Sequence, residues 1–378
     1  TAAVLNVEEK QQGDVIDNNV DLFYTADPDG DGTRTLESID ATASVEIVEP
    51  QVDAVKTTTL VPSPAEAGET ISYRVTLPTP GGPGNLEQNV TAYELTAQDV
   101  LPAGLELVPG SFDADYEGND ITTSFTTSET GWGLSASANI DLAPGEVITI
   151  TYDAVILDTV RDGELLTNEG DVEWTSLDGV VNTGDRGERG GDGDLDTTAG
   201  PTDPNDYESG DSASVRAELT PVFEFEKRIL SSSASHTDET GGTDVNIEDL
   251  VVGETVTYEL VATMGRGTTD GVRIVDQLSI ANGLLDITSV NICGGAALSL
   301  ASGTFAGLTP TVSDTGAGDT YFDRVEYNIG TVINDPALAT DAASEQIRIL
   351  ITAVVVNDIE NQDGDVIANT GTFFFQDD

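Results

Sequence analysis

The chain has 378 residues and carries 69 Asp and Glu against 14 Lys and Arg, which gives a formal net charge of −55. Phosphate backbones and anionic lipid headgroups are held by clustered basic side chains, so this balance excludes nucleic-acid binding and attachment to an anionic membrane surface. Hydrophobic residues make up 38% of the chain and Gly contributes 39 positions, enough apolar content for folded domains. Most carboxylates must therefore be solvated, screened by salt or bridged by divalent cations, and the last two indicate an extracellular setting.

The sequence shows neither a membrane span nor a disulfide framework. The longest apolar run, residues 349–356 (ILITAVVV), is shorter than the roughly 18 residues that a membrane-spanning helix needs, and it suits a buried strand. The single cysteine, Cys293, has no thiol partner and no His or Cys at metal-ligand spacing, so we expect a small buried residue. Because no initiating Met and no signal-like segment are present, we expect a piece of a longer or processed protein.

Short runs of alternating apolar and polar residues recur along the chain. Clear examples span residues 69–77, 145–156, 254–262 and 345–356, and they are rich in Val, Ile, Thr and Tyr. Clusters of Gly, Pro, Asn and Asp separate them, and no helical period with caps is sustained. A period of two is typical of strands with one buried face. We therefore predict an all-β fold.

The chain also repeats itself in a fixed order. Residues 65–75 (AEAGETISYRV) match residues 250–260 (LVVGETVTYEL). A third element occurs three times, as GDVIDNNVDLFYT at 13–25, GELLTNEGDVEWT at 163–175 and GDVIANTGTFFF at 364–375. Two homologous modules follow from this self-similarity.

The spacing of the repeated elements sets the predicted domain boundaries. Two complete modules span residues 51–219 and 220–378, and residues 1–50 hold the C-terminal remnant of a preceding module. Pro50 and Pro221 mark short, stiff junctions rather than flexible Gly/Ser tethers. We expect tandem modules in an elongated rod.

The ordered elements of each module resemble a known repeat. They are a first-strand lysine, a GETVTYEL-like run, an Asp before an LPAGL-like turn, an N-E-G or N-T-G step, and an acidic DPN-containing loop. This order resembles the DUF11 repeat of bacterial and archaeal surface proteins, and it is similar to the isopeptide-forming domains of Gram-positive fimbrial proteins. The resemblance covers essentially the whole chain and implies immunoglobulin-like β-sandwiches strung along adhesins and fimbrial shafts at the cell surface. The second module departs from it at Ser279, where the first keeps Pro102, and in an insertion at 293–323.

Lysine is scarce, and its placement is repeated. The chain holds only Lys10, Lys56 and Lys227, and the last two occupy equivalent first-strand positions. By the resemblance, such a lysine forms an amide bond with an Asn of the last strand, catalysed by a nearby carboxylic acid. The candidate sets are Lys56 with Asn168 and Asp99, and Lys227 with Asn369 and Asp276.

The chemistry of this reaction requires these residue types. The amine must be neutral to attack and the acid must be protonated to polarise the Asn carbonyl, and burial favours both states. Arginine cannot replace the lysine because it stays protonated. Asp99 and Asp276 align with each other, whereas Glu146 falls opposite Gln346, so we expect Asp to be the acid. The alternative interpretation is a solvated strand lysine and a turn-compatible asparagine.

Acidic loops form a second candidate site. Asp27, Asp29 and Asp31 stand at positions 1, 3 and 5 of a loop and are followed by Gly, as in a calcium-binding loop, although the Glu at position 12 is missing. The equivalent loop of the next module holds Asp192, Asp194 and Asp196. We therefore predict that these six residues bind Ca²⁺ and that the bound ions stiffen the joints between modules. Asp and Gly also form ordinary solvated turns, and an Asp-rich, lysine-poor surface fits a halophile equally well.

An enzyme is the least favoured functional class. The lone histidine, His236, lies in a polar loop without a recognisable Ser or Cys nucleophile. The favoured hypothesis is a structural stalk or filament segment whose partners are neighbouring modules or subunits. The alternatives are an adhesin module that contacts glycans or surfaces, and a self-polymerising filament subunit completed by strand donation.

Overall fold

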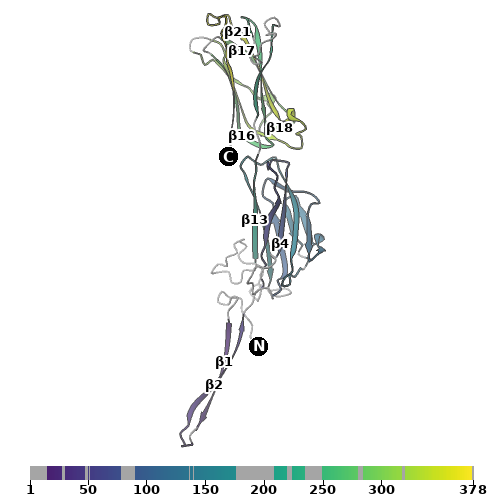
Figure 1. The fold of residues 1–378 in the computed structure, drawn as a ribbon, viewed down its shortest axis with the longest axis vertical. Helices are drawn as coiled ribbons and strands as arrows, with labels where there is room; N and C mark the ends of the chain where they lie inside the picture. The colour runs from purple at the N-terminus through teal and green to yellow at the C-terminus, as the bar shows by residue number, and fades with distance from the viewer. Residues whose placement is uncertain are drawn as a thin grey trace.

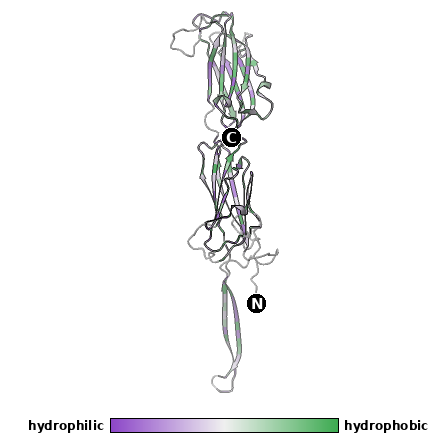
Figure 2. Cartoon of the chain, turned by 90° about the vertical axis from the view of Figure 1, so that its right-hand side faces the viewer, coloured by the Kyte–Doolittle hydropathy of each residue, from purple (hydrophilic) through white to green (hydrophobic). Residues whose placement is uncertain are grey.

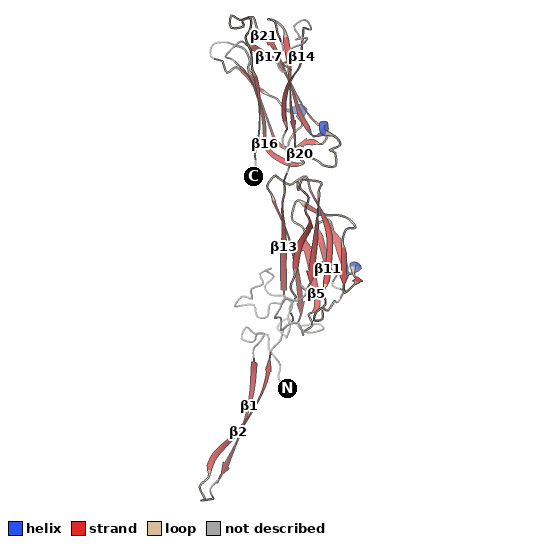
Figure 3. Ribbon diagram, viewed as in Figure 1, coloured by secondary structure: helices blue, strands red, loops and turns tan. Residues whose placement is uncertain are grey.

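The computed structural model describes residues 15–27, 30–46, 50, 52–77, 90–135, 137–138, 140–175, 208–218, 224–234, 249–279, 284–316 and 320–376. Strands dominate this part of the chain and form five sheets spread along one long axis (Figures 1 and 3). Short 3-10 turns occur at Thr122–Ser124, Phe305–Gly307 and Ala342–Glu345. Among the described residues, no helix is long and apolar enough to cross a membrane. The predicted all-β class is confirmed.

The first sandwich, formed by strands β3 to β13, has two facing sheets around one hydrophobic core. One sheet has the order β13-β12-β5-β10-β9, and the other has the order β3-β4-β11-β7-β8 with β6 paired to β11. The strands are β3 (Val55–Leu60), β4 (Thr70–Leu77), β5 (Tyr93–Val100), β6 (Leu105–Leu107), β7 (Asp113–Tyr116), β8 (Asn119–Asp120), β9 (Phe125–Ser128), β10 (Gly131–Leu134), β11 (Ile148–Ile156), β12 (Leu165–Thr175) and β13 (Glu208–Arg216).

The alternation seen in the sequence decides which side chains enter this core. Every second residue of β11, from Ile148 to Ile156, is buried, as its run of β-branched residues predicts. The same alternation turns Asp99 of β5 and Asn168 of β12 toward the interior, where they are buried among apolar side chains. The strand pattern therefore places polar groups inside the sandwich.

The second sandwich repeats this plan with strands β14 to β22. Its sheets have the orders β14-β15-β21-β17 and β18-β20-β16-β22, with β19 paired to β20. The strands are β14 (Phe225–Ser232), β15 (Thr255–Thr263), β16 (Gly267–Leu278), β17 (Leu285–Gly294), β18 (Leu298–Leu300), β19 (Thr311–Ser313), β20 (Arg324–Asn334), β21 (Gln346–Val355) and β22 (Asn369–Gln376). In the repeat alignment, β14, β15, β16, β21 and β22 correspond to β3, β4, β5, β11 and β12.

Cys293 is exposed on β17, so the prediction of a buried cysteine is wrong. The register of β17 shifts at a bulge between Ile287 and Ser289. After the bulge, Val290 and Ile292 pack against the core, and the alternation leaves Cys293 on the outer side.

A separate two-stranded hairpin precedes the first sandwich. Its strands are β1 (Val15–Ala26) and β2 (Thr35–Glu46), and they pair without interruption from end to end. The hairpin extends away from the sandwiches (Figures 1 and 2), and large apolar side chains such as Leu22 and Val45 are exposed on it. These three groups of strands lie inside the ranges predicted for the remnant and the two modules, whose boundaries stay a prediction.

One glycine controls the approach of β10 to β5. Gly131 has φ of +141°, and a Cβ atom at this position would lie under 3.0 Å from the carbonyl oxygen of Asp99. A Cβ atom at Gly133, on the same strand, would make only ordinary van der Waals contact, with its nearest neighbour 3.9 Å away. We expect Gly131→Ala to lower the free energy of unfolding of the first sandwich by about 2 kcal/mol, because β10 must move or strain.

The matched control is Gly133→Ala, which we expect to change the free energy of unfolding by no more than about 0.5 kcal/mol. Chemical denaturation monitored by tryptophan fluorescence compares the two variants, since Trp132 lies between the two glycines. Equal effects of both substitutions would contradict this account of the β5–β10 contact.

Candidate functional site

A lysine and an aspartate from opposite sheets meet inside the first sandwich. Lys56 lies on β3 and Asp99 on β5, and Lys56 Nζ is 2.6 Å from Asp99 Oδ2. The two residues are only 4% and 1% exposed. A Cβ atom at Gly170 would be in ordinary van der Waals contact with the pair, 3.6 Å from Lys56 Nζ and 3.5 Å from Asp99 Oδ2. The pair is therefore sealed from solvent by both sheets.

The third predicted residue, Asn168, lies beside this pair on β12. Its amide nitrogen donates a hydrogen bond of 2.8 Å to the hydroxyl of Tyr152, and that hydroxyl donates a hydrogen bond of 2.5 Å to Asp99 Oδ2. In the described part of the chain, the remaining oxygens, Asp99 Oδ1 and Asn168 Oδ1, have no hydrogen-bond partner. Tyr152 thus connects the acid to the amide.

Burial controls the protonation of these groups. It lowers the pKa of Lys56, although Asp99 opposes this shift. It also raises the pKa of Asp99, although Lys56 opposes this shift. Both shifts favour the neutral amine and the neutral acid, because a charged group loses hydration inside the protein. A neutral amine beside a protonated acid and a carboxamide is the arrangement that acyl transfer to nitrogen requires.

The second sandwich brings the equivalent residues together. Lys227 of β14 forms an ion pair with Asp276 of β16, and Asp276 is 1% exposed. Burial lowers the pKa of Lys227 and raises that of Asp276. The charge of Lys227 opposes the rise in the Asp276 pKa, and the amide of Asn369 opposes it to a smaller extent. Neither polar side-chain atom of Asn369, however, is in hydrogen-bond geometry with a described residue.

The two sites match in strand register. Asp99 lies opposite Gly170 on β12, and Asp276 lies opposite Gly371 on β22. In both strands the candidate Asn precedes this glycine by two residues. Each lysine also sits over a tyrosine ring, with Lys56 Nζ 5.6 Å from the Tyr73 centroid and Lys227 Nζ 5.3 Å from the Tyr258 centroid. The repeat alignment therefore holds at the level of side chains.

Sequence reasoning missed Tyr152. In the alignment of the runs 145–156 and 345–356, Tyr152 falls opposite Thr352. Only the strand register, in which Tyr152 faces Tyr73 and Ile351 faces Tyr258, places Ile351 at the equivalent position. Glu146, the alternative acid, lies elsewhere, where it accepts hydrogen bonds from the Tyr116 hydroxyl and the Ala143 amide.

Most of the predicted calcium ligands lie outside the described residues: Asp29, Asp192, Asp194 and Asp196. Asp27 accepts a hydrogen bond of 3.0 Å from the Gly32 amide, and Asp31 accepts one of 2.7 Å from the Thr33 amide. Polar turns make such contacts with or without a metal ion. Within the described ranges, no three His, Cys, Asp or Glu residues are grouped so that they could hold a metal ion.

The two sandwiches are joined by direct contacts away from the chain that links them. The backbone N–H of Thr268 donates a hydrogen bond of 2.9 Å to the carbonyl of Val160, and its hydroxyl donates one of 2.8 Å to the carbonyl of Asp158. Next to them, Arg161 Nε lies 2.7 Å from Asp270 Oδ2. Thr268 is 5% exposed, so the main-chain contact is sheltered from water.

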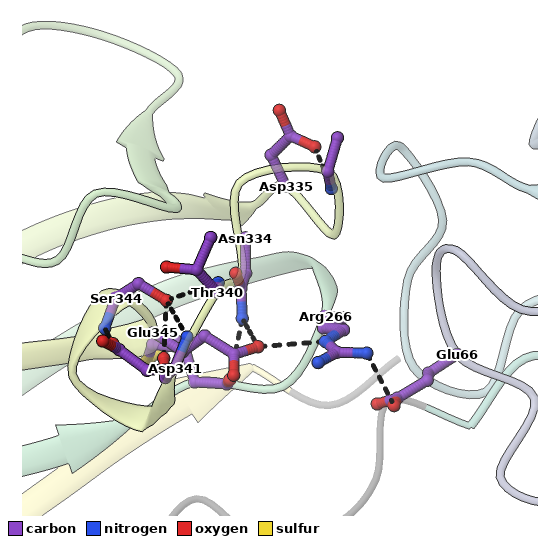
Figure 4. Close-up of polar contacts among 10 residues, drawn as sticks. Glu66, Arg266, Asn334, Asp335, Thr340, Asp341, Ser344 and Glu345 are labelled. Carbon is purple, nitrogen blue, oxygen red and sulfur yellow. Dashed lines mark hydrogen bonds and ion pairs between the residues drawn. The ribbon is translucent and has the colours of Figure 1, made fainter.

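A second contact crosses the same joint (Figure 4). Arg266 Nε donates a hydrogen bond of 3.0 Å to Glu345 of its own sandwich, while its other arm lies 3.8 Å from Glu66 of the first sandwich. Close by, Gly68 has φ of +88°, and a Cβ atom there would lie 2.7 Å from Pro336. The joint is therefore tightly packed as well as hydrogen-bonded.

No family model matches the chain, and no curated protein matches it. Among solved structures, the chain is similar to the C-terminal domain of the Streptococcus agalactiae AgI/II polypeptide BspA, with 15% identity, a TM-score of 0.30, and coverage of 86% of this chain and 96% of that one. It is also similar to the C-terminal domain of the Streptococcus pyogenes antigen I/II-family protein AspA (13% identity, TM-score 0.29, 86% and 96% coverage). A 35 kDa fragment of the major pilin GBS80 of Streptococcus agalactiae gives 9% identity, a TM-score of 0.27, and 86% and 91% coverage. At TM-scores this low, none of these similarities identifies the fold or the function of the chain.

We expect the joint contacts to limit bending between the sandwiches. The double variant Arg161→Ala, Thr268→Val removes two side-chain contacts across the joint and should broaden the distribution of molecular lengths measured by small-angle X-ray scattering. The matched control is Arg324→Ala, Thr257→Val, which removes an ion pair and a hydroxyl contact inside the second sandwich. The control should scatter like the parent chain, and identical scattering by all three proteins would show that these contacts do not hold the joint.

Proposed function

We propose that the chain is a load-bearing segment of an extracellular stalk or filament, in which each sandwich is closed by an isopeptide bond between a lysine and an asparagine. The observation that carries the proposal is the buried contact of Lys56 with Asp99 beside Asn168. The second sandwich repeats it with a half-buried Lys227 against the buried Asp276, next to Asn369. Each bond would form once, within the chain itself, and no external substrate would be turned over, so the chain would not act as an enzyme.

The unpaired oxygens of the first site support a reaction more than a simple ion pair. A buried acceptor without a donor costs on the order of 1–3 kcal/mol, and native proteins hold few such atoms. A buried ion pair alone also contributes little net stability. A proton on Asp99 would supply the donor that Asp99 Oδ1 and Asn168 Oδ1 lack. The neutral form of the site thus leaves fewer buried oxygens without a hydrogen-bond donor.

The position of the bond fits a mechanical role. Lys56 lies on the first strand of the sandwich, and Asn168 lies on the strand that precedes the last one, β13, from which the chain continues to the second sandwich. Tension along the chain would pass from β3 through the bond to β12 and bypass the residues between them. The bond would close a loop on the order of 100 residues, worth about 4–5 kcal/mol if chain entropy acts as it does for a disulfide.

Mass spectrometry of the intact chain tests the crosslinks. Each isopeptide bond releases one ammonia, so we expect the parent chain to be lighter than its sequence mass by two ammonia. Lys56→Arg should restore the mass of one ammonia, as should Lys227→Arg, because arginine keeps the positive charge but cannot form the bond. An unshifted parent mass would contradict the proposal.

We also propose that Ca²⁺ binds the acidic turns, at Asp27, Asp29 and Asp31 and at Asp192, Asp194 and Asp196. The net charge of −55 supports this, because many carboxylates lack basic partners. We expect calcium to raise the melting temperature of the parent chain at constant ionic strength, and a chelator to reverse the effect. Magnesium at the same concentration controls for charge screening. Equal melting temperatures with calcium and with chelator would contradict calcium binding and show that these carboxylates are simply solvated.

A second candidate function is a self-polymerising filament subunit, and the N-terminal hairpin favours it. Asn18 faces Ala43 across the hairpin, just as Asn168 faces Ala213 between β12 and β13. The side chains that β12 and β13 bury, Val172, Trp174 and Val215, correspond to Leu22, Tyr24 and Val45, which are 61%, 43% and 59% exposed. The hairpin thus exposes the apolar face that, in a complete sandwich, would pack against the opposite sheet.

Strand addition by the hairpin of another copy would cover this exposed apolar face. We expect the parent chain to associate with increasing concentration in sedimentation velocity, and a chain without residues 1–46 to stay monomeric. Equal sedimentation of both would exclude this candidate.

No described tryptophan supports the glycan-binding alternative. Trp132 and Trp174 are 5% and 2% exposed, so neither offers its ring to a sugar.

A further inference from the structure

Tyr152 lies between the acid and the atom that the crosslinking reaction must expel. Its hydroxyl is 2.5 Å from Asp99 Oδ2 and 2.8 Å from the amide nitrogen of Asn168. The residue is 1% exposed, and its ring stacks on Tyr73 with centroids 5.3 Å apart. The hydroxyl is therefore held in place and shielded from water.

We propose that Tyr152 is a catalytic residue of the first crosslink, which relays a proton from Asp99 to the leaving nitrogen of Asn168. The inference rests on the proposed crosslink and adds a component to it. It also assigns different rates to the two sites, because the second sandwich lacks this hydroxyl.

The reaction transfers the carbonyl carbon of Asn168 from its own nitrogen to the nitrogen of Lys56 and releases ammonia. Lys56 gives one proton to Asp99, and its neutral nitrogen attacks Cγ of Asn168, which forms the new C–N bond and moves the carbonyl π electrons to Oδ1. Asp99 then passes its proton to the Tyr152 oxygen while Tyr152 passes its own proton to Nδ2. The C–Nδ2 bond breaks, ammonia leaves with the electron pair, and the carbonyl re-forms. Asp99 finally takes the second proton from the lysine nitrogen, which leaves a neutral amide.

A phenol suits this relay because it can donate and accept at one atom. In the resting arrangement Tyr152 donates to Asp99 and accepts from Asn168. Rotation of the O–H bond reverses both roles without moving the ring. Burial and the neighbouring Asp99 raise the pKa of Tyr152, so the hydroxyl keeps its proton until the nitrogen of the intermediate needs it.

The second sandwich provides an internal comparison. Tyr152 faces Tyr73 across β11 and β4, and at the equivalent position Ile351 faces Tyr258 across β21 and β15. The lysine, the acid and the asparagine are all present there, but no hydroxyl stands in the place of Tyr152. The second site must therefore protonate its leaving nitrogen without the relay.

The experiment follows ammonia loss at each site with time after cell-free synthesis of the full chain, by mass spectrometry of the crosslinked peptides. We expect Tyr152→Phe to slow the first crosslink by about 100-fold, the low end of the range for a general acid, and to leave the second unchanged. Ile351→Tyr should accelerate the second crosslink. The matched control is Tyr116→Phe, which removes a half-buried hydroxyl of the same sandwich that donates to Glu146, away from the reacting groups, and should crosslink at the parent rate.

Circular dichroism confirms that each variant is folded before rates are compared. A folded Tyr152→Phe chain that crosslinks at the parent rate would overturn the relay and leave the crosslink standing. Slowing of the first site by Tyr116→Phe to the same degree would also overturn the relay, because it would assign the effect to the loss of a hydroxyl anywhere in the sandwich. The absence of ammonia loss at both sites of the parent chain would overturn the crosslink itself, and the relay with it.

Discussion

The burial of a lysine against an aspartate between two sheets is the constraint on which this structure depends. Lys56 and Asp99 come from opposite sheets, so the two layers cannot separate without exposing or splitting the pair. Two charges removed from water are costly, and that cost falls if the proton is shared or if the lysine becomes an amide. The alternation of the strands turns both residues inward, and the asparagine lies beside them.

The charge of the chain and its mechanical design are connected. With 69 acidic residues, repulsion along the chain favours an extended form, and only 14 basic residues can oppose it. Two arginines, Arg161 and Arg266, face carboxylates across the joint between the sandwiches. Two of the three lysines lie at the candidate crosslinks, Lys56 buried and Lys227 half-buried. A large share of the positive charge thus holds strands and modules together.

Much of this could be predicted from the sequence, because the chain contains two copies of one plan. Period-two runs gave the strands, and the duplicated lysines identified the groups that meet at Asp99 and Asp276. Tyr152 could not be found in the same way, since alignment of the two copies highlights what they share and this residue is what they do not share. Cys293 was placed wrongly because a β-bulge reverses the alternation, and the period of two gives no sign of it. The joint was expected to depend on acidic loops, but its described contacts use Thr268 and two arginines, which come from strands and turns distant in the sequence.

The central claim is that tension bypasses most of each sandwich through a covalent bond. Single-molecule force spectroscopy of the full chain, held at its two ends, measures this directly. We expect residues 57–167 and 228–368 never to contribute to the extension, so the released length falls short of the length of the unfolded chain by these segments. Release of the full length of both sandwiches would contradict it.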